Sequence, residues 1–482
     1  MSATDLPPLT EVDSGDEGEH RLHRALGPFQ LTMIGIGCII GAGIFVIAGT
    51  AAAQHAGPAV LISFAFAALA CLFAGLCYAE FASMIPVSGS AYTYAYATMG
   101  RFVAWFIGWN LVLEYGVSAS TVAVGWSGYF VSLLSNFGIA FPASLANAPL
   151  AGAGPSDMHW TGALINLPAT VLTLGLTALL IVGMRASAQF NGVMVLIKCG
   201  IILLVILFGL PFVQPDNLSP FIPPNEGEFG RFGWSGILAA SGMVFFAYIG
   251  FDSVSVAAQE AKNPQRDIPI GILGSLAISA ALYVLMALVL VGITDYRMLD
   301  VPNPVSFAVD QVPALAWLAL PINIGALAGL GSVVFVSLYG QSRIFYCMAR
   351  DGFLWPLFGE VHPTFRTPHR GTVVTGLIAA VLAALFPLDI LADLVSIGTL
   401  LAFVVVCVGI MMLRLSAPNA HRPFRTPFVW LTAPAGVIAC MALMLSLSSA
   451  TWIRLGLWTV LGLAIYFAYG RRHAAPAKWK VS

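Results

Sequence analysis

The sequence predicts an all-α membrane protein with 12 transmembrane helices, built as two oppositely oriented five-helix halves followed by two further helices. Three observations lead to this fold class. The 482-residue chain is 59% hydrophobic and only 9% charged, whereas a soluble domain is usually about 25% charged. Apolar runs of about 20 residues, the length that crosses a bilayer, recur along nearly the whole chain. Glycines interrupt the first and the sixth of these runs at matching places.

The same composition excludes several classes of function. A chain this apolar cannot cover itself with polar surface, which excludes a soluble enzyme, a nucleic-acid-binding protein and a disordered protein. The seven cysteines lie in or beside apolar runs and form no CxxC pair, so they are expected to pack rather than to form disulfides or bind metal. None of the four lysines follows a glycine, as a Walker A loop requires. We therefore expect no cofactor, no metal and no ATP-binding loop.

The predicted spans divide the chain into segments. Residues 1–27 are polar and acidic and lack the basic start and short apolar core of a signal peptide, so they are predicted to be a cytoplasmic tail. Residues 28–212 and 213–426 are predicted to form the two five-helix repeats, residues 427–470 the last two helices, and residues 471–482 a cytoplasmic C-terminal tail. The apolar runs expected to cross the membrane are Phe29–Ala53, Pro58–Met84, Phe102–Leu134, Leu164–Gly183, Phe190–Phe212, Phe232–Ala258, Pro269–Ile293, Leu315–Tyr339, Gly371–Phe386, Ile390–Leu413, Phe428–Leu447 and Trp452–Tyr469.

The basic residues predict the orientation of the chain. If the N-terminus is cytoplasmic, 17 of the 21 Lys and Arg residues fall in inside segments, three fall outside, and Lys198 falls within a span. Cytoplasmic loops of membrane proteins are enriched in Lys and Arg, and an odd number of spans would have scrambled this distribution. Both termini are therefore predicted to lie in the cytoplasm, with the chain crossing the cell membrane many times.

The first span contains four glycines in nine positions, Gly35, Gly37, Gly41 and Gly43. Each weakens a helix by about 1 kcal/mol relative to alanine. Gly37 and Gly41 also form a GxxxG pair, so close helix packing is an alternative explanation. Backbone groups freed inside a membrane must find partners, so an interruption implies a polar cavity. The sequence Gly41-Ala42-Gly43 favours an unwound point whose amides face a ligand.

The sixth span has a similar interruption, with Gly250 near its middle and Asp252 two residues later. Two interrupted helices at matching positions of oppositely oriented halves are typical of inverted-repeat secondary transporters. In that architecture an exposed helix N-terminus attracts a carboxylate, and an exposed C-terminus attracts an amine or a cation. A substrate that carries both groups, an amino acid, suits such a site.

Three ionisable residues, Glu114, Lys198 and Asp252, fall well inside predicted spans. Each would cost several kcal/mol facing lipid, so each is expected to face a cavity or a partner. The alternative for each is a structural hydrogen bond or ion pair. Glu80, Glu260 and Arg350 fall nearer the ends of spans and are interpreted mainly as interfacial or gating charges.

Several segments resemble one known family. The run from Ile39 to Phe45 is similar to the first-helix signature of the amino acid–polyamine–organocation superfamily. Other segments resemble its cationic amino acid transporter branch, particularly the bacterial members: Pro86–Tyr92, Phe245–Asp252, Asn263–Pro269, and Gly340–Arg343 with Arg350–Gly352. The resemblance covers nearly all of residues 25–470 and implies a LeuT-like 5+5 inverted repeat in which helices 1 and 6 are broken.

The resemblance also implies which residues form the site. The backbone of the broken helices would hold the α-carboxylate and α-amino groups, Phe246 would close over the substrate, and Glu114 and Asp252 would lie near it. Lys198 matches a fifth-helix lysine that, in sodium-independent relatives, stands where sodium-coupled ones hold the ion. Ala42 departs from relatives that carry a hydroxyl residue there, so one side-chain contact is absent. The substrate-binding residues implied are Ile40, Gly41, Ala42, Gly43, Ile44, Glu114, Phe246, Ala247, Ile249 and Asp252, and the coupling residue is Lys198.

These observations predict a secondary active amino acid transporter of the cell membrane, independent of sodium and coupled to protons. Its expected partners are the amino acid, protons and membrane lipid. Two buried carboxylates favour a cationic substrate, yet one of them could hold a proton or pair with Lys198, so a small neutral amino acid stays open. An amino acid or polyamine exchanger and a non-transporting amino acid sensor are the alternatives. No nucleophile–base pair or metal set in the sequence supports a membrane enzyme.

Overall fold

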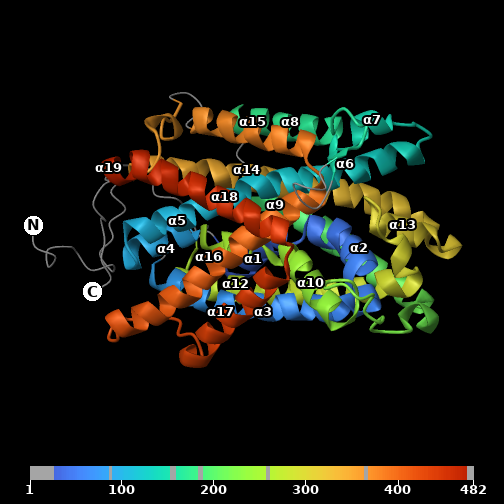
Figure 1. Ribbon diagram of the computed structural model, residues 1–482, viewed down its shortest axis with the longest axis horizontal. Coiled ribbons are helices and arrows are strands. Elements are labelled where there is room, and N and C mark those ends of the chain that lie inside the picture. The colour runs from blue at the N-terminus through green and yellow to red at the C-terminus, as the bar shows by residue number, and fades with distance from the viewer. Residues whose placement is uncertain are drawn as a thin grey trace, which may run out of the picture.

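The computed structural model describes residues 26–85, 90–151, 159–182, 188–256, 261–362 and 367–474. Helices make up most of these ranges and lie side by side along the long axis of the molecule (Figure 1). This confirms the predicted class of all-α membrane protein. Most of the two predicted tails, together with Glu260 and the first residues of the Pro86–Tyr92 motif, lies outside the described residues.

The α-helices are the main elements of the described chain. They are α1 (Pro28–Ile39), α2 (Ala48–Ala51), α3 (Val60–Met84), α4 (Ser90–Thr98), α5 (Arg101–Leu111), α6 (Ser118–Asn136), α7 (Ala143–Ala146), α8 (Leu167–Val182), α9 (Ala188–Gly209), α10 (Gly233–Val244), α11 (Ser253–Val256), α12 (Pro264–Ile293), α13 (Pro304–Asp310), α14 (Ala319–Arg350), α15 (His369–Leu385), α16 (Leu388–Ser416), α17 (Val429–Ser446), α18 (Ser449–Ile465) and α19 (Arg471–His473).

Short π- and 3₁₀-helical turns connect several of these helices. The π-helical turns are η2 (Gly43–Ile47), η3 (Ala52–Ala56), η5 (Val112–Val117) and η13 (Tyr466–Gly470). The 3₁₀ turns are η4 (Gly57–Ala59), η6 (Leu210–Phe212), η7 (Pro215–Leu218), η8 (Phe245–Tyr248), η10 (Tyr296–Met298), η11 (Pro313–Leu318) and η12 (Pro356–Phe358).

Every predicted span overlaps an apolar helix. Nine helical stretches in the described residues are long and apolar enough to cross a membrane, and one of them, Gly43–Met84, joins parts of two predicted spans. Shorter apolar helices at Pro28–Ile39, Leu167–Ile181 and His369–Leu385 match the remaining runs. The exact number of crossings and the division into two repeats stay predictions.

The segment between α6 and α8 contains a small sheet. Strands β1 (Leu150–Ala151) and β2 (His159–Trp160) pair antiparallel there, with Leu150 opposite Trp160. Two-residue strands are too short to give the alternating pattern by which a strand is recognised in a sequence. Next to the strands, the Thr161 hydroxyl donates to the Ala148 carbonyl at 2.8 Å.

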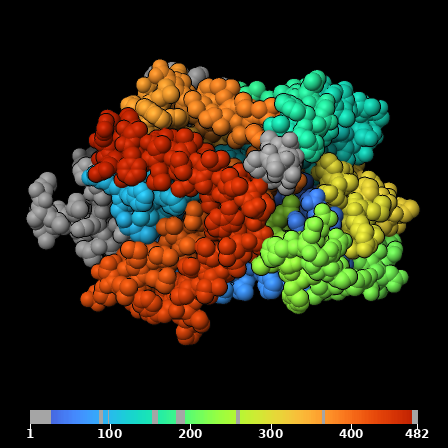
Figure 2. Space-filling model, in the orientation of Figure 1, coloured from blue at the N-terminus to red at the C-terminus, as the bar shows by residue number. Residues whose placement is uncertain are grey.

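The helices pack in two groups. In one group α1 packs along α12, and α3 packs along α12 and α10; in the other, α6 packs along α14 and α8, and α15 along α8. Figure 1 shows α3, α10 and α12 on one side of the molecule and α8, α14 and α15 on the other. Helix α16 contacts both groups. Figure 2 shows this face as closely packed, with one recess where the blue N-terminal segment is visible beside α13.

Candidate functional site

The first helix is interrupted in the middle of the membrane region. Helix α1 ends at Ile39, and Ile40 adopts an extended backbone with ψ of 102°. The chain turns at Gly41 and becomes helical again from Ala42, continuing as the π-helical turn η2. All five residues of the predicted unwound segment, Ile40, Gly41, Ala42, Gly43 and Ile44, are buried. The interruption therefore lies where the glycine pattern predicts it.

The second interruption follows the 3₁₀ turn η8, which contains Phe246 and Ala247. Ile249 is extended, and Gly250 has a φ of +114°. This conformation is rarely open to a residue with a Cβ atom, so glycine is required there for a backbone reason. Helix α11 then begins at Ser253, directly after Asp252.

The two interruptions lie against each other. A Cβ atom on Gly43 would overlap Ala247, and a Cβ atom on Gly250 would lie 2.9 Å from the Cβ of Cys38. Tyr283 of α12 joins them, because its hydroxyl lies 2.8 Å from the carbonyl oxygen of Ile39 and 3.0 Å from that of Ala247. One hydroxyl thus lies within hydrogen-bond distance of a carbonyl at each interruption, and its single O–H can donate to either of them.

Replacing Tyr283 with phenylalanine is expected to lower the free energy of unfolding by about 1–3 kcal/mol, because the hydroxyl that the two buried carbonyls share is lost. It is also expected to weaken substrate binding, since the two interruptions lose their common anchor. Thermal unfolding of the purified protein and a binding titration measure the two effects. Tyr346→Phe is a matched control, because the Tyr346 hydroxyl makes no hydrogen bond among the described residues. Equal melting temperatures for the two variants would contradict the anchoring role.

Lys198 of α9 is completely buried. Its Nζ donates to the carbonyl oxygens of Gly37 at 2.5 Å and Ile40 at 2.8 Å. On the opposite side, a Cβ atom on Gly329 of α14 would lie 3.3 Å from the lysine Cδ. The stem of the lysine therefore packs against α14. Its ammonium lies at the C-terminus of α1, where the helix dipole and free carbonyls favour a cation.

A small cavity lies beside the second interruption. Its volume is about 30 Å³, room for one or two water molecules. Among its walls are Glu114, which lies on the π-helical turn η5, and Val333 of α14. The full lining is Cys38, Glu114, Tyr115, Ser118, Ile249, Gly250, Ser253, Val333, Val336 and Ser337.

Two carboxyl groups approach each other at this cavity. Glu114 is 4% exposed, and its Oε1 atom has no hydrogen-bond partner among the described residues. It interacts electrostatically with Asp252. The Tyr115 hydroxyl donates to Oδ2 of Asp252 at 2.9 Å and lies 3.2 Å from the Ser253 hydroxyl. Adjacent carboxylates in a buried site favour a proton or a cationic group between them.

The structure thus brings together part of the predicted site. Glu114 and Ile249 line the cavity, and Asp252 reaches it through Tyr115. Gly41 lies just behind the wall, because its Cβ atom would be 3.4 Å from Val333. The other predicted substrate-binding residues are buried in the two interruptions: Ile40, Ala42, Gly43, Ile44, Phe246 and Ala247. Lys198 lies at the end of α1, next to Cys38.

Sequence reasoning missed several residues that form the cavity. Ser118 follows Glu114 by four residues, and Val333 and Ser337 are also four apart, so each pair shares one helix face. The Glu114–Ser118 spacing could have indicated the first of these faces. Tyr115 and Tyr283 gave no signal, because a tyrosine in an apolar run is ordinary until its partners from other helices are known.

Comparison with known proteins identifies the family of this chain. The family model of amino acid permeases matches residues 26–466. The chain belongs to the amino acid permease family. This confirms the resemblance to the amino acid–polyamine–organocation superfamily and makes this permease a multi-pass membrane protein.

Individual relatives of this permease carry names that state different ligands. A methylthioribose transporter of Bacillus subtilis is 45% identical over 96% of this chain and 97% of its own length. The branched-chain amino acid permease BcaP of the same organism is 44% identical over 97% of both chains. Human cationic amino acid transporter 4 is 36% identical over 84% of this chain and 62% of its own length. A shared fold therefore leaves the ligand to be decided by the residues of the site.

Proposed function

We propose that this permease is a secondary active transporter that moves a cationic or small neutral L-amino acid across the cell membrane by alternating access, without sodium and coupled to protons. The observation that carries the proposal is the contact of Lys198 with the carbonyls of Gly37 and Ile40. The dipole and the unpaired carbonyls of a buried helix C-terminus favour a positive charge beside it. Lys198 supplies that charge covalently, so a dissolved sodium ion is not required there.

The two interruptions suit the backbone groups of an amino acid. The N–H groups at the start of the helix after Gly41 suit an α-carboxylate, since the first N–H groups of a helix have no partner within it. The free carbonyls before each interruption suit an α-ammonium. We assign these contacts to Ile40–Ile44 and Phe246–Ile249, with Phe246 as the covering ring. Glu114 then faces the substrate side chain through its free Oε1.

Transport in this proposal requires the site to open. The cavity of about 30 Å³ is far smaller than an amino acid, so the substrate must separate its walls. The walls come from both helix groups, with Ile249 and Gly250 following α10 and with Val333 and Ser337 on α14. Movement of one group against the other would expose the site to alternate sides. We place both termini in the cytoplasm, on the evidence of the 17 basic residues in the inside segments.

The substrate class is tested by a competition panel in proteoliposomes with an imposed pH gradient. The panel holds the twenty amino acids, putrescine and methylthioribose, because a relative named for that sugar is 45% identical. Uptake of labelled substrate against its gradient is the supporting result. Counterflow without net accumulation would favour an exchanger, and binding without any flux would favour a sensor.

Neutralising Glu114 or Asp252 distinguishes a cationic substrate from a neutral one. If the two carboxyls receive a cationic side chain, Glu114→Gln and Asp252→Asn are expected to weaken arginine or lysine at least about tenfold more than alanine, because truncating a buried charge pair commonly costs 2–5 kcal/mol. The measurement is the inhibition constant of each amino acid. Glu360→Gln, in an exposed ion pair with Arg370, is the control. Equal losses for all substrates would assign the pair to proton handling or structure instead.

A further inference from the structure

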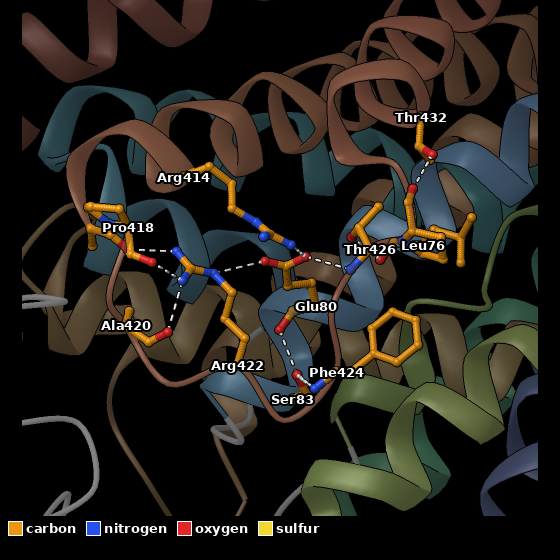
Figure 3. Close-up of polar contacts among 12 residues, drawn as sticks. Leu76, Glu80, Ser83, Arg414, Pro418, Ala420, Arg422, Phe424, Thr426 and Thr432 are labelled. Carbon is orange, nitrogen blue, oxygen red and sulfur yellow. Dashed lines mark hydrogen bonds and ion pairs between the residues drawn. The ribbon is translucent and has the colours of Figure 1, made fainter.

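Glu80 is the centre of a buried group of charges that does not line the cavity. It lies in the last turns of α3 and is 0% exposed. Its carboxylate accepts hydrogen bonds from Nη2 of Arg414 at 2.8 Å and from the Thr426 backbone N–H at 2.7 Å. Nε of Arg422 lies 3.1 Å from its second oxygen. Figure 3 shows both arginines converging on Glu80. We call these four residues the Glu80 clamp.

Arg422 also fixes the end of α16. Its guanidinium donates to the carbonyl oxygens of Ala417 at 2.6 Å, Pro418 at 3.0 Å and Ala420 at 2.8 Å (Figure 3). These carbonyls follow the last residue of α16 and have no helical partner. The same side chain therefore folds the chain after α16 and attaches it to α3.

The loop between α16 and α17 is bound along α3 as well. The Thr426 hydroxyl donates to the Leu76 carbonyl at 3.0 Å, and the Phe424 N–H donates to the Ser83 hydroxyl at 3.3 Å. Leu76 and Ser83 lie two turns apart on α3. The loop thus covers the last two turns of α3 and cannot slide along it without breaking these bonds.

The two helices that the clamp joins also meet beside the second interruption. Tyr78 of α3 and Phe403 of α16 have ring centroids 6.3 Å apart. Both contact Phe251, at 6.2 Å from Tyr78 and 5.1 Å from Phe403. Phe251 lies between Gly250 and Asp252. Any shift of α3 relative to α16 would therefore move the aromatic rings that support the interruption.

We propose that Glu80 is a positioning residue of the transport cycle, through which the clamp keeps α3 and α16 in register and so holds Phe251 and the second interruption in place. This role rests on the proposed transport function and adds to it a group that touches neither substrate nor cavity. Removing one partner of a buried ion pair leaves the other uncompensated. The remaining charges would draw apart, and α3 and α16 would lose their register.

The test compares Glu80→Gln, Arg414→Gln and the double variant. Arg414 is the milder site, because 19% of its side chain is exposed and Arg422 and Thr426 still hold Glu80. Each single variant is expected to lower the maximal uptake rate at least about tenfold and to change KM by a smaller factor, because the clamp touches no substrate and reaches the second interruption only through Phe251. The double variant is expected to be no slower than Glu80→Gln, because Glu80→Gln already removes the carboxylate with which Arg414 pairs. Arg414→Lys should recover part of the rate.

A matched control and a second readout separate positioning from folding. Arg370→Gln removes an exposed ion pair of 2.6 Å to Glu360, with about half of each side chain in solvent, and should leave uptake unchanged. Cys38, which lines the cavity against Gly250, should be alkylated faster in Arg414→Gln than in the parent, with the partly exposed Cys199 and Cys347 replaced by serine in both.

Several outcomes would overturn the positioning role. These are wild-type uptake by both single variants, a rise in KM that parallels the loss of rate, or Cys38 alkylation at the parent rate. If Arg414→Gln has both a lower melting temperature and no substrate binding, the clamp serves folding alone. If the parent protein takes up nothing from the panel, the proposed function fails, and Cys38 alkylation still decides the clamp.

Discussion

Replacing Gly43 with leucine is expected to abolish substrate binding and transport while leaving the protein folded and inserted. A Cβ atom at this position would overlap the Cα and Cβ atoms of Ala247 and lie 3.0 Å from its backbone nitrogen. The Cα and nitrogen atoms of Ala247 belong to the backbone of the second interruption, so they cannot move aside as the end of a flexible side chain can. Even Gly43→Ala would push the two interruptions apart, because protein interiors have no spare volume. The helix group of α6, α8, α14 and α15 does not include these residues, so the fold should persist.

Gly250→Leu is expected to have the same effect for a second reason. Its φ of +114° is strained for any residue with a side chain, and its Cβ atom would lie 2.9 Å from Cys38. Uptake and ligand-induced thermal stabilisation measure the loss. Gly200→Leu on α9 is the matched control, because a Cβ atom there has no neighbour within 4 Å among the described residues. Normal transport by both Gly43→Leu and Gly250→Leu would refute the site at the interruptions.

Replacing Lys198 with alanine is expected to abolish gradient-driven uptake. The change removes the donor to the carbonyls of Gly37 and Ile40, and each unsatisfied buried carbonyl costs about 1–3 kcal/mol. It also removes the positive charge that lies at this end of α1. Uptake by the unmodified protein is expected to be unchanged when potassium replaces sodium. Uptake in solutions of defined sodium, potassium and pH measures these effects.

Lys198→Arg distinguishes a titrating lysine from a fixed charge, because an arginine stays protonated at all physiological pH values. If Lys198 loses its proton in one conformation and regains it in another, uptake by the unmodified protein falls as the outside pH rises, and Lys198→Arg loses that response. A fixed positive charge would instead leave uptake by both proteins flat with pH. A requirement for sodium, or uptake that is flat with pH in the unmodified protein, would disprove proton coupling through Lys198.

The interruptions could be predicted because their cause is local. Gly41-Ala42-Gly43 and Gly250 are glycines whose absent side chains decide the backbone, and Gly250 adopts a conformation that strains other residues. The charge of Lys198 within an apolar run likewise signals that a partner must exist. Its place beside the first interruption came from the family resemblance and not from the composition of the chain.

The remaining parts of the site depend on contacts between helices that are distant in the sequence. Tyr283 lies 244 residues from its partner Ile39, so no local pattern could single it out. Glu80 was interpreted as an interfacial or gating charge, but it is completely buried, and its partner Arg414 lies 334 residues away. A charge near the end of a span looks exposed in the sequence until a distant loop is known to cover it.

The small volume of the cavity has a consequence for inhibition. In the proposed transport cycle the cavity of about 30 Å³ must widen to admit an amino acid. Part of the contact free energy of a ligand would then be consumed in separating the walls, and its measured affinity would fall below what its buried area suggests. A compound that keeps the amino acid backbone but carries a side chain too bulky for the walls to close over would keep the walls apart. Such a compound would hold the permease on one side of its cycle, and its potency would grow with its rigidity rather than with its polar contacts.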